Sequence, residues 1–290
     1  MSLVINHNLM AMNAARSLSQ TYNRLSVSVS RLASGLRINS AADDAAGLAI
    51  REIMRTDIRV LNQGVRNAND AISLIQTADG ALSVIDEKLT RMKELAEQAA
   101  TGTYTAAQRL IMDSEYQAMA SEISRIATAT DFNGVKLLDG SLSGTANQMK
   151  IHFGTGNSSA EDYYYIQINA ATASALGVGQ AVAAGTAGYT ISTQSAAQTA
   201  LEAIDSAVQT KDNIRANLGA VANRLSNTIS NLSIQAENLQ AAESRISDVD
   251  VATEMTEFTR NQILVQAAVA MLSQANSLPQ LALQLIGGGA

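Results

Sequence analysis

Few side chains in this sequence are of the types that catalyse reactions or bind metals, and they are widely spaced. The two histidines, His7 and His152, lie far apart and no His-Glu-x-x-His pattern is present, so no zinc site is predicted. Asp43 and Asp44 could form a pair of catalytic carboxylates, but they precede a helical pattern, where acids stabilise a helix N-terminus. Gly154-Thr-Gly156 continues as a polar turn rather than a nucleotide-binding loop. We therefore predict no catalytic residue, no metal and no cofactor.

Composition excludes further classes of function. The 290-residue chain has a net charge of −6 and no cluster of Lys and Arg, so binding to nucleic acid is not predicted. It has no cysteine, which excludes disulfides and thiolate metal sites. Hydrophobic residues make up 47% but aromatic residues only 3%, a balance that favours slender helices over a thick globular core.

The elements that must position any functional surface are predicted to be helices, because apolar residues recur every three or four positions through most of the chain. One of these helices should be about 55 residues long, or roughly 80 Å. The single proline, Pro279, is expected to bend or end the last helix. The apolar periods cover residues 11–36, 65–99, 106–129, 204–246 and 251–272.

The middle of the chain differs in kind. Residues 141–195 are rich in Gly, Tyr, Ser and Thr, and two alternating runs, 149–153 and 163–168, predict a β-hairpin closed by residues 154–161. Asn133-Gly134 predicts a tight turn just before this segment. The expected fold class is therefore mainly α: an elongated antiparallel helical rod or coiled coil with a small β-hairpin region and both termini at one end.

The two ends of the chain are predicted to pair through apolar seams. Residues 1–42 contain four Arg and no acid, whereas residues 248–290 contain four acids and one Arg, so the ends are complementary in charge. The residues expected to pair by charge are Arg31, Arg37, Asp248 and Asp250. The seam residues expected to serve subunit assembly are Leu18, Tyr22, Leu25, Val29, Leu32 and Leu36, with Met255, Phe258, Val265, Val269 and Leu272.

The ends also lack the charges that keep an isolated helix soluble. Residues 261–290 carry no charged side chain, but their many Asn, Gln and Ser side chains argue against membrane insertion. Residues 1–8 show no cationic segment followed by a long apolar stretch, so no cleaved signal peptide is expected. We expect both ends to be disordered in a free subunit and to become helical in a polymer.

Three motifs resemble those of one protein family, the bacterial flagellins. The first is Leu32-Ala-Ser-Gly-Leu-Arg-Ile-Asn-Ser-Ala-Ala-Asp-Asp-Ala-Ala-Gly-Leu-Ala-Ile50, which resembles the family's N-terminal signature. The second is Asp131-Phe-Asn-Gly-Val-Lys-Leu-Leu138. The third is Arg245-Ile-Ser-Asp-Val-Asp-Val-Ala-Thr-Glu-Met255, followed by Gln262-Ile-Leu and Gln274-Ala-Asn276. The resemblance covers residues 1–140 and 196–290, and the short middle resembles that of flagellins without large outer domains.

This resemblance implies a structural subunit that polymerises into the helical flagellar filament for swimming, outside the cell. Residues 1–43 and 248–290 would form a terminal coiled-coil core domain. Residues 44–140 and 196–247 would form a helical rod domain, and residues 141–195 a short, variable surface segment. The resemblance also implies export in an unfolded state by the flagellar type III apparatus. The implied partners are further copies of the chain, an export chaperone, the filament cap and the hook-junction proteins.

One implied site is specific to a short run of residues. Arg91-Met-Lys-Glu-Leu-Ala96 resembles the stretch by which Toll-like receptor 5 senses many flagellins, and Arg91, Leu95 and Glu115 fall on matching positions. The chain departs from that pattern at Lys93, where Arg is frequent, and at Glu97, where an apolar residue is frequent. Because Lys lacks the planar fork of Arg, the substitution at position 93 changes the surface offered to a receptor.

Two other functions remain open at the level of sequence. A hook–filament junction protein of the same family would share the end motifs but serve in few copies. A secreted adhesin or immune ligand would act as a monomer. Growth of filaments from seeds would separate the filament subunit from both.

Overall fold

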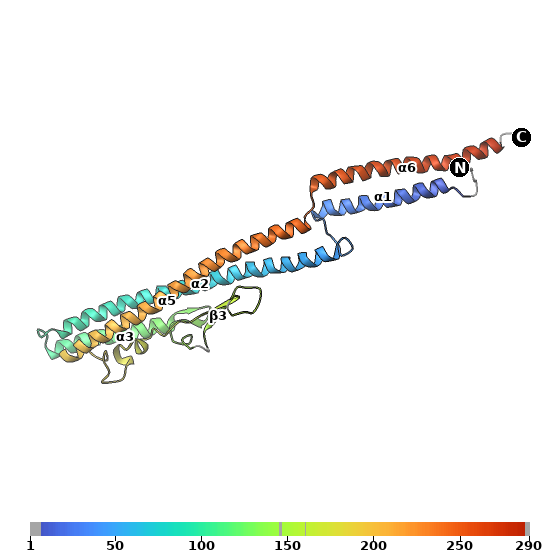
Figure 1. Cartoon of the computed structure of the whole chain (residues 1–290). Helices are drawn as coiled ribbons and strands as arrows, with labels where there is room; N and C mark the ends of the chain where they lie inside the picture. Colours follow the sequence, from blue (N-terminus) through green and yellow to red (C-terminus); the bar gives the residue numbers. More distant parts are fainter. Residues whose placement is uncertain (1–6, 145–146, 160, 288–290) are drawn as a thin grey trace. The chain divides into compact units, whose positions relative to one another are not determined.

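The computed structural model describes residues 7–144, 147–159 and 161–287 (Figure 1). The chain divides into two compact units, here called the terminal unit (Met1–Thr56 with Asn238–Ala290) and the central unit (Asp57–Glu237). The long elements are α1 (Leu9–Ser34), α2 (Ala45–Ala100), α3 (Ala106–Ala129), α5 (Gln194–Ser247) and α6 (Val251–Gly287). The short elements are β1 (Asp131–Phe132), β2 (Val135–Lys136), β3 (Met149–His152), β4 (Tyr163–Ile166), α4 (Ala173–Leu176) and the 3₁₀ turn η1 (Gly179–Ala181).

The predicted fold class is confirmed, since the described chain is mainly α with two small antiparallel hairpins. The predicted third helix has the observed bounds of α3, and the predicted helix of about 55 residues is the 56-residue α2. A capping box explains where α3 begins: the Thr105 hydroxyl accepts from the backbone N–H of Gln108, and the Gln108 side chain accepts from that of Thr105.

In the terminal unit, α1 and α6 lie side by side and antiparallel (Figure 1). Gly35 ends α1 with φ of 71°, a left-handed conformation that favours glycine. The chain then pairs with the segment before α6, because Leu36 and Asp248 form an antiparallel bridge and Val249 donates to the Gly35 carbonyl. At the opposite end of the helix pair, the Asn8 side chain contacts the backbone of Ala275, so both chain ends lie at one end of this pair, as predicted.

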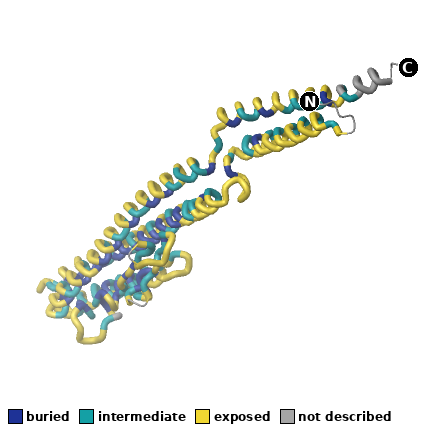
Figure 2. Tube along the Cα trace, turned by 45° about the vertical axis from the view of Figure 1, so that its right-hand side comes forward, coloured by how far each residue is buried: buried dark blue, intermediate teal, exposed yellow. Residues whose placement is uncertain are grey.

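In the central unit, α2, α3 and α5 share one continuous apolar core (Figure 2). Side chains at helical spacing on α2 are fully buried, among them Leu82, Ile85, Leu89 and Met92. One polar residue, Lys211, occupies a seam position of α5. It is buried, and its ammonium pairs with Asp86 and Asp212. Burial lowers the pKa of Lys211, but these two carboxylates outweigh it and hold the pKa above its usual value.

The hairpins follow from local turn chemistry. Asn133 and Gly134 have φ of 51° and 81°, which makes the predicted turn between β1 and β2. Strand β3 pairs with β4 in the register Met149↔Ile166 to His152↔Tyr163, which confirms the second predicted hairpin. Tyr164 contacts the core while Tyr165 is exposed, because successive side chains of a strand point to opposite faces.

The segment 141–195 also reaches the interior of the central unit. Ile168, Val178 and Ile191 are fully buried in the shared core. Two α3 side chains hold the end of the segment: the Tyr116 hydroxyl donates to the Gly188 carbonyl at 2.9 Å, and the Gln117 amide donates to the Tyr189 carbonyl at 2.7 Å. Residues 141–195 therefore also contribute apolar side chains to the core, which the prediction of a surface segment did not include.

Pro279 was predicted to bend or end the last helix; an end at this position is wrong, because α6 continues through Pro279 to Gly287, and the bend stays a prediction. A proline inside a helix removes one backbone N–H, so the continuation needs another donor for the carbonyl four residues earlier. The side chain of Asn8 supplies that donor. No helix in the described part of the chain is both long enough and apolar enough to span a membrane.

Candidate assembly surface of the terminal helices

The contact face between α1 and α6 repeats every seven residues on both helices. The partly or fully buried positions that follow this repeat are Ala11, Ala14, Leu18, Thr21, Leu25, Ser28 and Leu32 on α1, and Glu254, Phe258, Asn261, Val265, Ala268, Leu272 and Ala275 on α6. Outside the repeat, Arg31 on α1 and Glu257, Ser277 and Pro279 on α6 are also partly buried. From Ala14 on α1 and throughout α6, each row alternates a small or polar residue with a large apolar one. This seam is therefore thin, since half of its positions bury little apolar area.

The structure places only some of the predicted seam residues in this contact face. Leu18, Leu25 and Leu32 of α1 and Phe258, Val265 and Leu272 of α6 lie in it, while Leu36 lies beyond α1 in the bridge to Asp248. The other four are exposed: Tyr22 (62%), Val29 (48%), Met255 (46%) and Val269 (52%). The two kinds of position share the same period, so periodicity alone does not tell which flank of the helix meets its partner.

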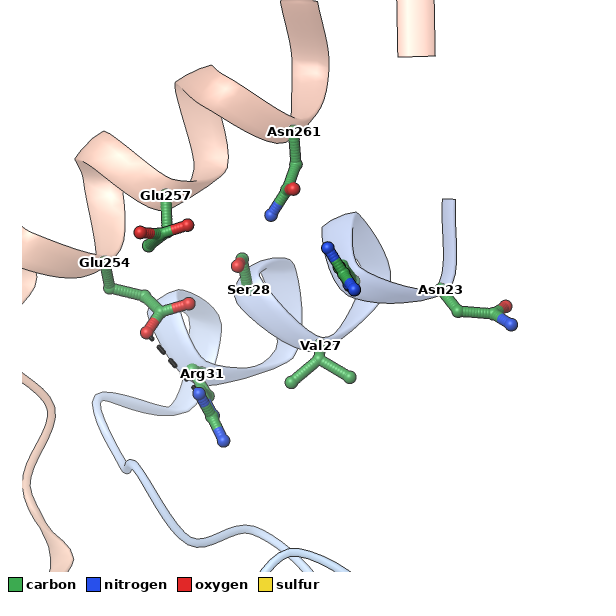
Figure 3. Close-up of a pocket in the computed structure, with 8 residues that line it drawn as sticks. Asn23, Val27, Ser28, Arg31, Glu254, Glu257 and Asn261 are labelled. Carbon is green, nitrogen blue, oxygen red and sulfur yellow. Dashed lines mark ion pairs between the residues drawn. The ribbon is translucent and has the colours of Figure 1, made fainter. Parts of the chain in front are cut away.

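The centre of the seam is polar (Figure 3). Ser28 and Asn261 are only 4% and 5% exposed, and Arg31 lies 3.7 Å from the carboxylate of Glu254. A groove of about 430 Å³ opens here, and it is lined by Asn23, Arg24, Val27, Ser28, Arg31, Glu254, Glu257 and Asn261. Ser28 and Asn261 were not among the predicted seam residues, although each lies seven residues from another buried seam position, Thr21 and Ala268 respectively.

The charged residues at the ends of these helices have partners other than those expected. Among the described residues, no ion pair joins Arg31 or Arg37 to Asp248 or Asp250. The expectation is corrected as follows: Arg31 pairs with Glu254, and Arg37 donates to the Ile246 carbonyl at 2.7 Å. Asp248 accepts from the Ser244 hydroxyl at 2.7 Å.

Asp250 begins α6, because its carboxylate accepts from the backbone N–H groups of Ala252 (2.9 Å) and Thr253 (3.3 Å). These hydrogen bonds and the one from the Thr253 hydroxyl lower the pKa of Asp250. The free N–H groups of a helix start are thus nearer to this carboxylate than any Arg, which explains why charge complementarity in the sequence did not produce the expected pairs.

The adjacent carboxylates Asp43 and Asp44 have structural partners. Asp44 accepts from the backbone N–H groups of Ala46 and Gly47 at the start of α2, which confirms the predicted role at a helix start. Asp43 accepts from Ser40 and from the backbone of Asn39, and these bonds lower its pKa. In the described residues, no group of three or more His, Cys, Asp or Glu side chains is arranged to hold a metal ion.

The outer flanks of both helices are apolar and exposed in the single chain. Many residues of α1 and α6 are exposed, whereas buried residues are more frequent in the central unit (Figure 2). The fully buried apolar side chains belong to the central unit, and the exposed residues of α1 and α6 include many large apolar side chains. They are Leu9, Met10, Met12, Tyr22, Val27 and Val29 on α1, and Val251, Met255, Ile263, Leu264, Val269 and Met271 on α6. We call these twelve residues the apolar flanks.

The residues matched to receptor recognition lie in the central unit. The Arg91 guanidinium donates to Glu115 and to Glu94, each at 2.9 Å, and these bonds raise its pKa. Arg91 and Glu115 are exposed, but Leu95 is only 2% exposed and belongs to the core. In this arrangement the Leu95 side chain packs inside the helix bundle, and its role in recognition stays a prediction.

The comparisons with known proteins match two regions of the chain, one towards each end. The family model for the bacterial flagellin N-terminal helical region matches residues 5–143, and that for the bacterial flagellin C-terminal helical region matches residues 201–286. Flagellin of Halalkalibacterium halodurans is 45% identical over 284 residues, covering 98% of this chain and all of that protein. Flagellin of Bacillus subtilis is 45% identical over 302 residues, covering 97% and 99%.

A solved structure is similar as well: Bacillus cereus flagellin is 32% identical, with a TM-score of 0.46, over 61% of this chain and 94% of that chain. Both family models and the full-length relatives define one class, the flagellar structural proteins. This chain belongs to the bacterial flagellin family, and it is a filament subunit.

Proposed function

We propose that the apolar flanks of α1 and α6 are the surfaces through which identical copies of this chain assemble into a filament. The observation that supports this is the contrast between a thin, polar seam and two exposed apolar flanks on the same helices. Burial of one such side chain contributes about 1.5–3 kcal/mol when it is complete. Neighbouring copies would therefore gain more from the flanks than α1 and α6 gain from each other.

In this proposal residues 1–43 and 248–290 form the core of the polymer, residues 44–140 and 196–247 form a helical rod around it, and residues 141–195 are carried by the rod. The two terminal helices remain disordered in the dilute monomer, because ordering them costs more than their own seam returns. Hydrogen exchange tests this directly. Slow exchange of the amides of residues 5–35 in a dilute monomer would contradict it.

The test of assembly is seeded growth. Purified chain is added to short filament fragments, and elongation is followed by sedimentation and by negative-stain microscopy. A filament subunit elongates the seeds over many lengths, whereas a junction protein of the same family binds the seed ends without elongation. A chain that stays monomeric in sedimentation at high concentration would support an adhesin or a monomeric immune ligand instead.

We further propose that the chain works outside the cell, as part of the flagellum, after export through the flagellar type III apparatus. Its partners would be an export chaperone on the C-terminal helix, the filament cap and the hook-junction proteins. The exposed apolar flank of α6 supports a chaperone, because such a surface needs a cover before assembly. A complex of the C-terminal segment with the chaperone, lost when Ile263 and Leu264 are both changed to Ser, would test this.

Recognition by Toll-like receptor 5 is a second proposed function. It is supported by the exposed ion pair between Arg91 and Glu115 on the surface formed by α2 and α3. A receptor reporter assay with monomeric protein tests it: Arg91→Ala should reduce the response, and Lys93→Arg should increase it. An unchanged response in both variants would refute a role for this surface.

A further inference from the structure

Pro279 leaves one acceptor in α6 without its usual donor. In an α-helix each carbonyl accepts from the N–H four residues later, and proline has no N–H. The carbonyl of Ala275 therefore lacks its usual donor four residues later, although α6 continues through this point. Ala275 is only 7% exposed, so water does not readily replace the missing donor.

The missing donor comes from the other end of the chain. The Nδ2 group of Asn8 donates to the Ala275 carbonyl at 2.7 Å. The Oδ1 atom of the same side chain accepts from the backbone N–H of Ala11 at 3.0 Å, and so caps the start of α1. One amide thus satisfies a donor at the beginning of α1 and an acceptor in α6, which requires the two helices to be aligned at this level.

We propose that Asn8 and Pro279 form a latch that sets the register in which α1 and α6 join. Apart from the Leu36–Asp248 bridge and the Arg31–Glu254 pair towards the other end of the two helices, the seam specifies register weakly, because its alternate positions on α1 are the small or short residues Ala14, Thr21 and Ser28. A directional polar contact at one position is the established physical means by which paired helices select a single register. A one-turn shift of α1 along α6 would leave both the Asn8 donor and the Ala275 carbonyl unsatisfied.

The latch rests on the proposed assembly function, because its test measures filament elongation. The same experiment nevertheless distinguishes a failure of the latch from a failure of assembly. If wild-type chain does not elongate seeds, assembly itself is refuted. If wild type elongates and the latch variants behave as wild type, only the latch is refuted.

The test is a double-mutant cycle on the full chain, read as the critical concentration for seeded elongation. Asn8→Ser keeps a capping oxygen but removes the amide donor, and should raise the critical concentration about three- to tenfold, the effect of one lost hydrogen bond. Pro279→Ala returns an N–H to the helix, so that Asn8→Ser in this background should change the critical concentration by less than about twofold. Asn13→Ser, at an exposed position of α1, is the matched control and should have no effect.

Equal effects of Asn8→Ser in both backgrounds would overturn the latch. A third variant keeps the test decisive if Pro279→Ala does not assemble. Asn8→Ala removes the cap and the donor together, so a wild-type critical concentration for Asn8→Ser with a raised one for Asn8→Ala would show that Asn8 is only a cap. That result would also overturn the proposal, whereas a raised value for both variants supports it.

Discussion

The central unit and the terminal unit use similar helices in opposite ways. In the central unit three long helices and a hairpin region bury one another, and side chains such as Leu82 and Ile85 are completely enclosed. In the terminal unit two helices share one narrow seam whose centre contains Ser28, Asn261 and the Arg31–Glu254 pair. The first unit thus completes its core within the chain, and the second leaves apolar surface for other molecules.

Because of this difference, we expect stability of the monomer and assembly of the polymer to depend on different residues. Substitutions in the core of the central unit should change the free energy of unfolding of the monomer. Substitutions on the apolar flanks should change the critical concentration of the polymer and leave the monomer as stable as before.

The largest expected effect is that of a charge placed on an apolar flank. Val29→Asp should raise the critical concentration for seeded elongation by about a hundredfold or more, because covering an unpaired carboxylate costs several kcal/mol and each factor of ten corresponds to about 1.4 kcal/mol. Sedimentation of seeded reactions measures it. Gln20→Asp adds the same charge at a polar, exposed position of α1 and should have a much smaller effect. Equal effects of the two variants would mean that the apolar flank is not the surface that assembles.

The next effect belongs to the core of the central unit. Leu82→Ala should lower the free energy of unfolding of the monomer by about 2–5 kcal/mol, since it removes a fully buried side chain and leaves a cavity. Val84→Ala, two residues further along α2 at an exposed position, should change it by less than about 0.5 kcal/mol. Denaturant unfolding followed by circular dichroism measures both. Similar costs for the two variants would contradict the burial pattern of α2.

Much of this architecture could be predicted from the sequence, because local signals determine it. The bounds of α3 follow from the helical period of residues 106–129, and the first hairpin follows from Asn133-Gly134. The flank that faces the partner helix could not be predicted, since Tyr22 and Thr21 both fit a seven-residue repeat. The partners of the charged residues could not be predicted either. Backbone N–H groups compete with Arg for the Asp250 carboxylate, and a count of charged side chains does not include these backbone groups.

The Asn8–Pro279 latch could not be predicted from the sequence either, because it depends on a contact between distant parts of the chain. The sequence indicated a helix breaker at Pro279, and propensity alone predicts a bend or an end there. Only the antiparallel pairing of α1 with α6 brings the amide of Asn8 to the carbonyl that the proline leaves free. Tertiary contact of this kind overrides a local preference whenever it supplies the missing hydrogen bond.

A smaller effect is expected at the turn that ends α1. Gly35→Val should weaken filament elongation about five- to thirtyfold and leave secretion of the subunit nearly unchanged, because a β-branched residue in the left-handed region costs about 1–2 kcal/mol. Space is not the cause, since an added Cβ would meet no atom within 4 Å. Gly35→Asn, which tolerates this conformation, is the control and should assemble almost normally. Equal loss in the two variants would show that the side chain, not the backbone conformation, is at fault.

The smallest expected effect concerns acid and the second hairpin. The Asp162 carboxylate accepts from the backbone N–H groups of Ser158 (2.7 Å) and Gly156 (3.0 Å), and these bonds hold its pKa below the usual value. A carboxyl whose pKa is lowered by folding stabilises the hairpin above its unfolded pKa, and this contribution is lost as the pH falls through the lowered folded pKa. Exchange of the Gly156 and Ser158 amides should therefore accelerate, relative to other amides of the central unit, as the pH falls through that range. Asp162→Asn should remove this pH dependence, and its persistence in the variant would mean that another group controls the loop.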